Sequence, residues 1–337
     1  MDVTTVADDL IVVHDGVDVH RLTDLGPESE HDVRGLLVRT LDRPPGALLC
    51  RFGTVNDVHF GEIEAGRIDD EPGGPIQRVA DGEAPYPETM NRGATAEMAA
   101  ADLAAVIVKG DLTLDGAPHE LEAFERCYRD VFGDRLHVVR GNHDAYRGQD
   151  YYSRDQWVEL PGVAIALMDT TIPCKTTGSL SAAQLEWLDA RAAESGVPVI
   201  VMGHHQQWLG SVDGRPANRS DDYFGMHPDA SDALSGVIER RPAIVAYTAG
   251  HTHRHRVRRL PSGVPSVEIG CVKDFPGTWA EYKVYEGGIM QVVHRVSTPE
   301  ALQWSERCRH LYSDFGIDYE TYALGRLEDR CFNLALR

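Results

Sequence analysis

The first 45 residues alternate between apolar and polar positions in short runs. Three such runs, LIVVH, VDVHRL and LLVRTL, are separated by turn-forming segments that include HDG and LGPES. A period of two is typical of β-strands that bury one face. We therefore predict a β-strand appendage over residues 1–45, too short to form a complete sandwich.

From residue 46 onward, apolar runs alternate with helical stretches, which predicts an α/β sheet flanked by helices over residues 46–298. The clearest helix runs from Ser181 to Ala193, because Ser181 and Gln184 form a capping box ahead of an apolar stripe. Residues 299–337 are predicted to form a C-terminal helical tail.

Residues 61–92 interrupt this alternation with an acidic segment rich in glycine and proline that shows no clear periodicity. The segment is too long for an ordinary connection between two elements. It is therefore an insertion in the predicted domain. A lid or substrate loop and a plain surface insertion both fit its composition.

Composition narrows the class of protein. With 337 residues and 42% hydrophobic content, the chain can bury a sizeable core. No apolar run approaches the roughly 20 residues that span a bilayer, and the acidic start MDVTTVADDLIVV lacks the positive charge of a secretion signal. We therefore expect a cytoplasmic protein that does not interact with membranes. Its six cysteines show no CxxC spacing, so we interpret them as reduced structural thiols.

The formal charge of −20 repels polyanions, so long nucleic acid is not an expected partner.

Candidate metal ligands appear where apolar runs end. Four of these runs are followed by glycine and then by potential metal ligands: Asp111; Asn142, His143 and Asp144; His204 and His205; His251 and His253. The carboxyl ends of strands open onto one edge of a sheet, and glycine lets the backbone turn sharply there. The four segments are therefore expected to converge.

A fifth segment places Asp57 and His59 two residues apart, so that both can point toward one cation. The combined set contains carboxylate, amide and imidazole groups but no thiolate, which favours Mn, Fe, Co or Zn. Seven ligands exceed the needs of one ion with open positions, whereas two divalent ions would use them. Such a centre would keep a net positive charge for a phosphate despite the acidic chain.

These motifs, in their order along the chain, resemble the signature of the calcineurin-like metallophosphoesterase family. They are Asp57-x-His59, Gly110-Asp111, Gly141-Asn142-His143-Asp144, Gly203-His204 and Gly250-His251-x-His253. The resemblance spans roughly residues 50–255 and implies a four-layer α/β/β/α sandwich. It also implies that Asp57, His59 and His253 hold one metal ion, that Asn142, His204 and His251 hold the other, and that Asp111 bridges the two ions.

The Asp after His143 and the pair His204-His205 are similar to the branch of cyclic-nucleotide and glycerophosphodiester phosphodiesterases. This sequence departs from that branch at Gln206, where a proline is usual. We therefore expect hydrolysis of a small phosphodiester. A phosphomonoesterase acting on a small phosphorylated metabolite is the alternative, and a non-catalytic binding protein on the same fold is another.

A metal-bridging hydroxide would attack phosphorus in this reaction. His143 is placed to protonate the leaving oxygen, and Asp144 is expected to fix the tautomer of His143. Arg92, Arg147 and Lys175 are candidate contacts for the substrate, although isolated basic residues on loops are usually solvated. His205 either contacts the substrate or supports the ligand next to it.

Overall fold

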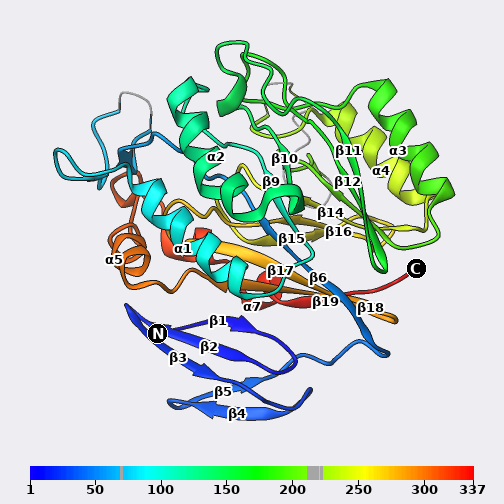
Figure 1. The fold of residues 1–337 in the computed structure, drawn as a ribbon, viewed down its shortest axis with the longest axis horizontal. Helices are drawn as coiled ribbons and strands as arrows, with labels where there is room; N and C mark the ends of the chain where they lie inside the picture. Colours follow the sequence, from blue (N-terminus) through cyan, green and yellow to red (C-terminus); the bar gives the residue numbers. More distant parts are fainter. Residues whose placement is uncertain (69–70, 211–219, 221–222) are drawn as a thin grey trace.

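A computed structural model describes residues 1–68, 71–210, 220 and 223–337. Two six-stranded sheets form its centre (Figure 1). The first has the order β10-β9-β6-β17-β18-β19 and comprises β6 (Leu48–Val55), β9 (Ala105–Lys109), β10 (Leu136–Val139), β17 (Thr278–Tyr285), β18 (Gly288–Arg295) and β19 (Phe332–Leu334). The second has the order β11-β12-β13-β14-β16-β15 and comprises β11 (Gln156–Leu160), β12 (Val163–Leu167), β13 (Val199–Met202), β14 (Ile244–Ala249), β15 (Arg256–Arg259) and β16 (Pro265–Glu268).

The two sheets share a buried apolar core. Phe52 and Ile107 of the first sheet and Ile165 and Ile200 of the second belong to it. Strands such as β9 and β12 are buried along their whole length, which explains their continuous apolar sequences. The parallel pairs β6–β9, β9–β10 and β13–β14 align the carboxyl ends of these strands within each sheet.

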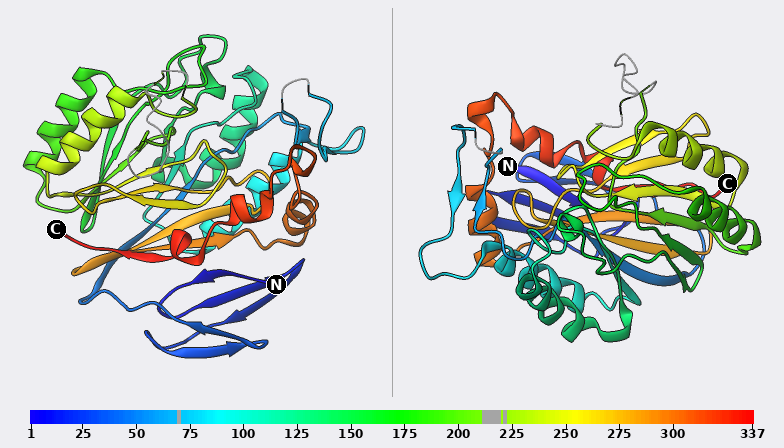
Figure 2. Two further views of the ribbon diagram at one scale, coloured as in Figure 1. Left: turned by 180° about the vertical axis from the view of Figure 1, so that it is seen from behind. Right: turned by 90° about the horizontal axis from the view of Figure 1, so that it is seen from above.

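Helices cover the outer faces of both sheets (Figures 1 and 2). The first sheet is covered by α1 (Tyr86–Ala100), α2 (Pro118–Phe132) and α5 (Pro299–Arg307), and the second by α3 (Ala182–Glu194) and α4 (Pro228–Arg240). The predicted cap of α3 is present, because the Ser181 hydroxyl accepts a hydrogen bond from the backbone N–H of Gln184 at 3.2 Å. The predicted α/β class is confirmed, and the layers are consistent with the expected sandwich.

Residues 2–39 form five strands beside the main body, drawn in blue in Figures 1 and 2. They are β1 (Asp2–Val6), β2 (Ile11–Asp15), β3 (Asp18–Leu22), β4 (Glu30–Val33) and β5 (Leu36–Arg39). The Thr5 hydroxyl donates to the carbonyl of Val293 on β18 at 2.7 Å, and an apolar cluster lies around this contact. The boundary at residue 45 stays a prediction.

The 61–92 insertion is only partly irregular. It contains the short pair β7 (Glu64–Ala65) and β8 (Gln77–Arg78), and its last residues belong to α1. Asp69 and Asp70 lie outside the described residues. The lack of periodicity in the sequence did not reveal α1, which begins at Tyr86, where Pro87 in its first turn fixes a helical φ.

The tail contains the helices α5, α6 (Tyr319–Leu324) and α7 (Leu327–Arg330), and it ends in a strand. β19 pairs antiparallel with β18 and extends the first sheet. Its three residues are too few to show a period in the sequence. Across the described part of the chain, no helix combines the length and the apolar character that crossing a bilayer requires.

Candidate metal centre

The two sheets bring the predicted ligands together at one edge. Ligand-bearing loops follow β6, β9 and β10 of the first sheet and β13 and β14 of the second. The residues gathered there include all seven predicted ligands: Asp57, His59, Asp111, Asn142, His204, His251 and His253. The expected convergence of strand ends is therefore present in the structure.

Five of these side chains stand on backbone with a left-handed conformation. The φ angles are 53° at Asp57, 47° at His59, 52° at Asp111, 69° at His251 and 55° at His253. Residues other than glycine rarely adopt positive φ, and each such residue typically costs about 1–3 kcal/mol. Strained backbone of this kind concentrates at functional sites.

Asp111 lies at the middle of the cluster. Its Oδ2 atom is 3.4 Å from Nε2 of His59 and 3.2 Å from Nε2 of His204. Its other oxygen, Oδ1, accepts the backbone N–H of His143 at 3.0 Å. A single carboxylate oxygen thus faces ligands from both predicted metal sites, which is the placement a bridging ligand needs.

The first predicted metal site forms around Asp57. Oδ1 of Asp57 is 3.5 Å from Nε2 of His253, and both carboxylate oxygens lie 3.1 Å from the backbone N–H of His251. The ring of His59 lies edge-on to the ring of His253, with 5.4 Å between centroids. Asp57, His59 and His253 also place one ligand atom each within 4.8 Å of one another, close enough for one ion.

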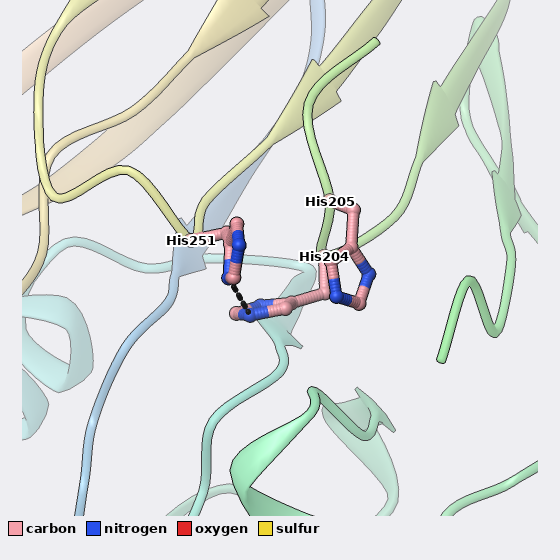
Figure 3. A group of neighbouring side chains, drawn as sticks. All are labelled: His204, His205 and His251. Atoms are coloured by element: carbon pink, nitrogen blue, oxygen red, sulfur yellow. Dashed lines mark hydrogen bonds between the residues drawn. The ribbon is translucent and has the colours of Figure 1, made fainter. Parts of the chain in front are cut away.

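The second predicted metal site forms around His204, which Figure 3 shows with His205 and His251. The Nδ1–H of His204 donates to the carbonyl of Lys109 at 2.9 Å, so Nε2 is directed at the cluster. This Nε2 is 3.0 Å from Oδ1 of Asn142 and 3.2 Å from Nδ1 of His251. Burial opposes protonation of His204, but the carboxylate of Asp111 outweighs it and raises the pKa of His204 to about 9.

The donor atoms fit divalent metal ions. Both ring nitrogens of His59 and Nε2 of His251 are buried, and they make no hydrogen bond to the residues that the structure describes. Buried polar atoms are almost always hydrogen-bonded, so three unpaired imidazole nitrogens in one cluster need another partner. Imidazole, carboxylate and amide donors suit Mn, Fe, Co and Zn.

Glycines allow the close approach that was expected at the strand ends. A Cβ atom on Gly141 would lie 2.2 Å from Oδ1 of Asp111, and one on Gly250 would lie 2.7 Å from Oδ2 of Asp57. Gly110 has a φ of +89°, and a Cβ atom there would lie 2.4 Å from Nδ1 of His204. Any side chain at these positions would displace a candidate ligand.

His143 lies beside the cluster and contacts it through His59, with ring centroids 4.5 Å apart. Its Nδ1–H donates to the carbonyl of Leu114 at 2.6 Å, which leaves Nε2 free to exchange a proton. The expectation that Asp144 fixes this tautomer is wrong, because the backbone of Leu114 does so.

Asp144 instead joins two ligand-bearing loops. Its carboxylate accepts the backbone N–H groups of Gly141 at 2.8 Å, Thr113 at 2.9 Å and Leu112 at 3.0 Å. The loop after β9 and the loop after β10 are thereby held at a fixed separation. Asp144 positions Asp111 and Asn142 and does not contact the imidazole of His143 by hydrogen bond in the described structure.

Two carboxylates that no motif had indicated lie close to the histidines, the half-buried Glu62 and the buried Asp274. Oε2 of Glu62 is 3.8 Å from Nδ1 of His59 and accepts hydrogen bonds from Lys273 at 2.6 Å and Tyr86 at 2.7 Å. Asp274 places a carboxylate oxygen within 4.8 Å of a ring nitrogen of His253. Carboxylates behind metal-binding histidines orient the ring and raise its basicity. These residues carry no sequence signal, since their contacts are long-range.

We predict that Glu62→Gln weakens metal binding about 10- to 100-fold, the usual cost of losing such a supporting carboxylate. Isothermal titration calorimetry, in which Mn²⁺ is added to the metal-free protein, measures the change in affinity. Glu64→Gln is the matched control, because Glu64 pairs with Arg67 and Arg78 and not with a histidine. Equal affinities for the Glu62 variant and the parent chain would contradict the supporting role.

A cavity of about 680 Å³ opens beside the cluster. Its walls combine Asp111, Asn142, His143, His251 and His253 with Arg67, Ile68, Tyr146, Thr176, Phe224, Thr252, Tyr312, Ile317, Tyr319 and Tyr322. The insertion thus contributes Arg67 and Ile68, and the tail contributes four residues. Sequence reasoning missed these wall residues, because neither segment has a periodic pattern or a motif.

The three basic residues that were predicted to contact the substrate lie outside this cavity. Arg92 is on α1, pairs with Glu88 at 3.4 Å and lines a separate pocket. Arg147 pairs with Asp115 at the surface, and Lys175 is exposed. The cavity lining includes none of these three basic residues.

His205 is buried next to the cluster, but both of its ring nitrogens are engaged. Nδ1 is 2.8 Å from the hydroxyl of Thr170, and Nε2 donates to the carbonyl of Thr176 at 3.1 Å. His205 therefore supports the loop of His204, and it does not line the cavity.

Comparisons with known proteins agree with this geometry. The model of the calcineurin-like phosphoesterase family matches residues 50–255. A probable cyclic nucleotide phosphodiesterase from Synechococcus sp. is 30% identical over 155 residues, which is 44% of this chain and 57% of the relative. The chain therefore matches less than two thirds of that relative's length.

Among solved structures, a dimetal phosphatase from Danio rerio is similar with a TM-score of 0.52 and 17% identity, over 74% of this chain and 98% of that chain. A purple acid phosphatase from yellow lupin (Lupinus luteus) has a TM-score of 0.49 and 12% identity, over 83% of this chain and 60% of that chain. At 17% identity, the similarity to the Danio rerio phosphatase concerns the fold alone.

Proposed function

Because the chain belongs to the calcineurin-like phosphoesterase family, we propose that it is a dinuclear metal-dependent hydrolase of small phosphodiesters. The observation that carries the proposal is the position of Asp111, whose Oδ2 atom lies within 3.4 Å of histidines from both halves of the ligand set. A degenerate binding protein on this fold would be expected to lack ligands, and this chain has all seven.

In this proposal one metal ion is held by Asp57, His59 and His253, the other by Asn142, His204 and His251, and Asp111 serves both. Bound divalent ions supply Lewis acidity toward the phosphate oxygens and lower the pKa of water. Mn, Fe, Zn and Co all suit the donor atoms.

The remaining chemistry falls to His143. The carbonyl of Leu114 holds the proton on Nδ1, so His143 can donate a proton to the leaving oxygen only from Nε2 and only when the ring is doubly protonated. His143 lines the cavity, where that oxygen would depart. Asp144 acts indirectly by fixing the two loops that carry Asp111 and Asn142.

The charge of the cavity favours a diester over a monoester. Within the described lining, Arg67 is the single lysine or arginine, and it already pairs with Glu64 at 2.9 Å. A monoester dianion carries one more negative charge, and its sites commonly add cationic clamps. The similarity to a probable cyclic nucleotide phosphodiesterase also favours a diester.

We therefore predict that kcat/KM for bis(4-nitrophenyl) phosphate exceeds that for 4-nitrophenyl phosphate at least about tenfold, or about 1.4 kcal/mol. Both substrates are compared with the same metal and pH. A chelator should abolish both activities. A preference for the monoester of this size would favour the phosphomonoesterase alternative. Absence of turnover with every tested divalent metal would favour the binding protein.

A further inference from the structure

Three exposed apolar side chains line the cavity, and we call them its apolar wall. The exposed fractions are 52% for Phe224, 38% for Ile317 and 37% for Tyr322, and all three residues line the cavity. Among the described residues, Phe224 and Tyr322 are the two most exposed phenylalanine, tyrosine or tryptophan side chains. Surface apolar residues normally occur singly, so a gathering beside a candidate active site indicates a binding surface.

The structure holds this wall against the metal cluster. Phe224 stacks on the ring of His251 with centroids 4.1 Å apart and an angle of 26° between the planes. The hydroxyl of Tyr322 donates to the carbonyl of Thr252 at 2.9 Å, which lies between two candidate ligands. The hydroxyl of Tyr319 donates to Asp274 at 2.8 Å. Aromatic side chains are therefore held next to the candidate metal ligands.

We propose that Phe224 and Tyr322 bind the nucleobase of a mononucleotide phosphodiester while its phosphate lies at the metal cluster. The inference rests on the proposed function and specifies its substrate class. A flat base gains from aromatic surface, by about tenfold or more for each stacked base. A glycerophosphodiester has no such group, and its hydroxyls would lose water against these rings.

The size and charge of the cavity agree with a single nucleotide unit. About 680 Å³ is within the usual range of roughly 300–1,000 Å³ for small-ligand pockets. A mononucleotide diester carries one negative charge. The single arginine of the described lining can offset that one charge. A polynucleotide carries many negative charges and would be repelled by a chain of net charge −20.

The test compares two diesters with the same leaving group, thymidine 5′-(4-nitrophenyl phosphate) and methyl 4-nitrophenyl phosphate, with Mn²⁺ at one pH. The full-length chain should prefer the thymidine ester at least about tenfold in kcat/KM, mainly through KM. Phe224→Ala and Tyr322→Ala should each bring this ratio toward one. Tyr322→Phe keeps the ring and should keep the ratio. Leu37→Ala, at a leucine with 71% exposure on β5, is the control for loss of surface apolar area.

Equal kcat/KM values for the two esters in the parent chain would overturn the inference while leaving phosphodiester hydrolysis intact. A preference that persists in both alanine variants would overturn it as well. If an alanine variant does not fold, Phe224→Leu replaces it, since leucine keeps apolar volume without a flat ring. An unchanged ratio of kcat/KM for the two esters in Phe224→Leu counts against the proposal. Failure of the parent chain to hydrolyse either ester would refute the proposed function, and this inference with it.

Discussion

Replacing Asp111 with alanine is expected to remove metal ions from both sites and to lower kcat/KM for a diester by about 10³-fold or more. The reason is that Oδ2 of Asp111 faces His59 at 3.4 Å and His204 at 3.2 Å, so one substitution affects both halves of the centre. Losing metal-ion stabilisation of a transition state costs several kcal/mol, which corresponds to about 10³ in rate. Elemental analysis after purification in excess Mn²⁺ should give about two ions for the parent chain and clearly fewer for the variant.

Asp115→Ala is the matched control for this substitution. Asp115 lies in the same loop after β9, but it pairs with Arg147 at the surface and belongs to none of the ligand groups in the described structure. Its metal content and activity should match those of the parent chain. If the parent chain binds no more than one ion, and Asp111→Ala leaves that content unchanged, the dinuclear proposal is refuted.

His143→Ala should keep the metal ions and lose about 10²–10⁴-fold in kcat, the usual contribution of a general acid. The ring of His143 adjoins His59 but is not needed to complete either ligand set. The loss should be larger for a diester with an alkyl leaving group than for one with a nitrophenyl leaving group, because basic leaving oxygens need the proton most. Initial rates on both substrates, with metal content measured in parallel, test this.

His119→Ala serves as the control, since His119 is exposed on α2. Equal losses on alkyl and nitrophenyl esters would indicate that His143 positions the substrate and does not donate a proton. Loss of metal from the His143 variant would instead make it a ligand.

The cluster of candidate metal ligands could be predicted from the sequence because its signal is local. Each candidate ligand lies two to four residues after the end of a strand. The glycines at Gly110, Gly141 and Gly250 are needed where the backbone meets a ligand side chain. Sheet geometry then brings strand ends to one edge. The helix after Ser181 was equally predictable, because its cap is formed by neighbours in sequence.

The walls of the cavity could not be predicted in this way. Arg67 and Tyr322 are more than 250 positions apart in the sequence and meet only through the folded sheets. Glu62 contacts Lys273 across a similar separation, so neither residue has a local pattern. The role of Asp144 was misassigned for the same reason, because its partners include the backbone of Leu112 and Thr113 on another loop.

The left-handed backbone at five candidate ligands has a consequence for evolutionary drift. At each of these positions glycine would remove the cost of a positive φ, so the metal-free chain becomes more stable wherever that gain exceeds the loss of the side chain's own contacts, such as the hydrogen bonds from the backbone N–H of His251 to Asp57. A higher unfolding temperature for metal-free Asp57→Gly than for the metal-free parent chain would demonstrate this. In a descendant that is no longer selected for hydrolysis, stabilising substitutions would then be favoured first at the ligand positions. Loss of the activity would begin at the centre of the site.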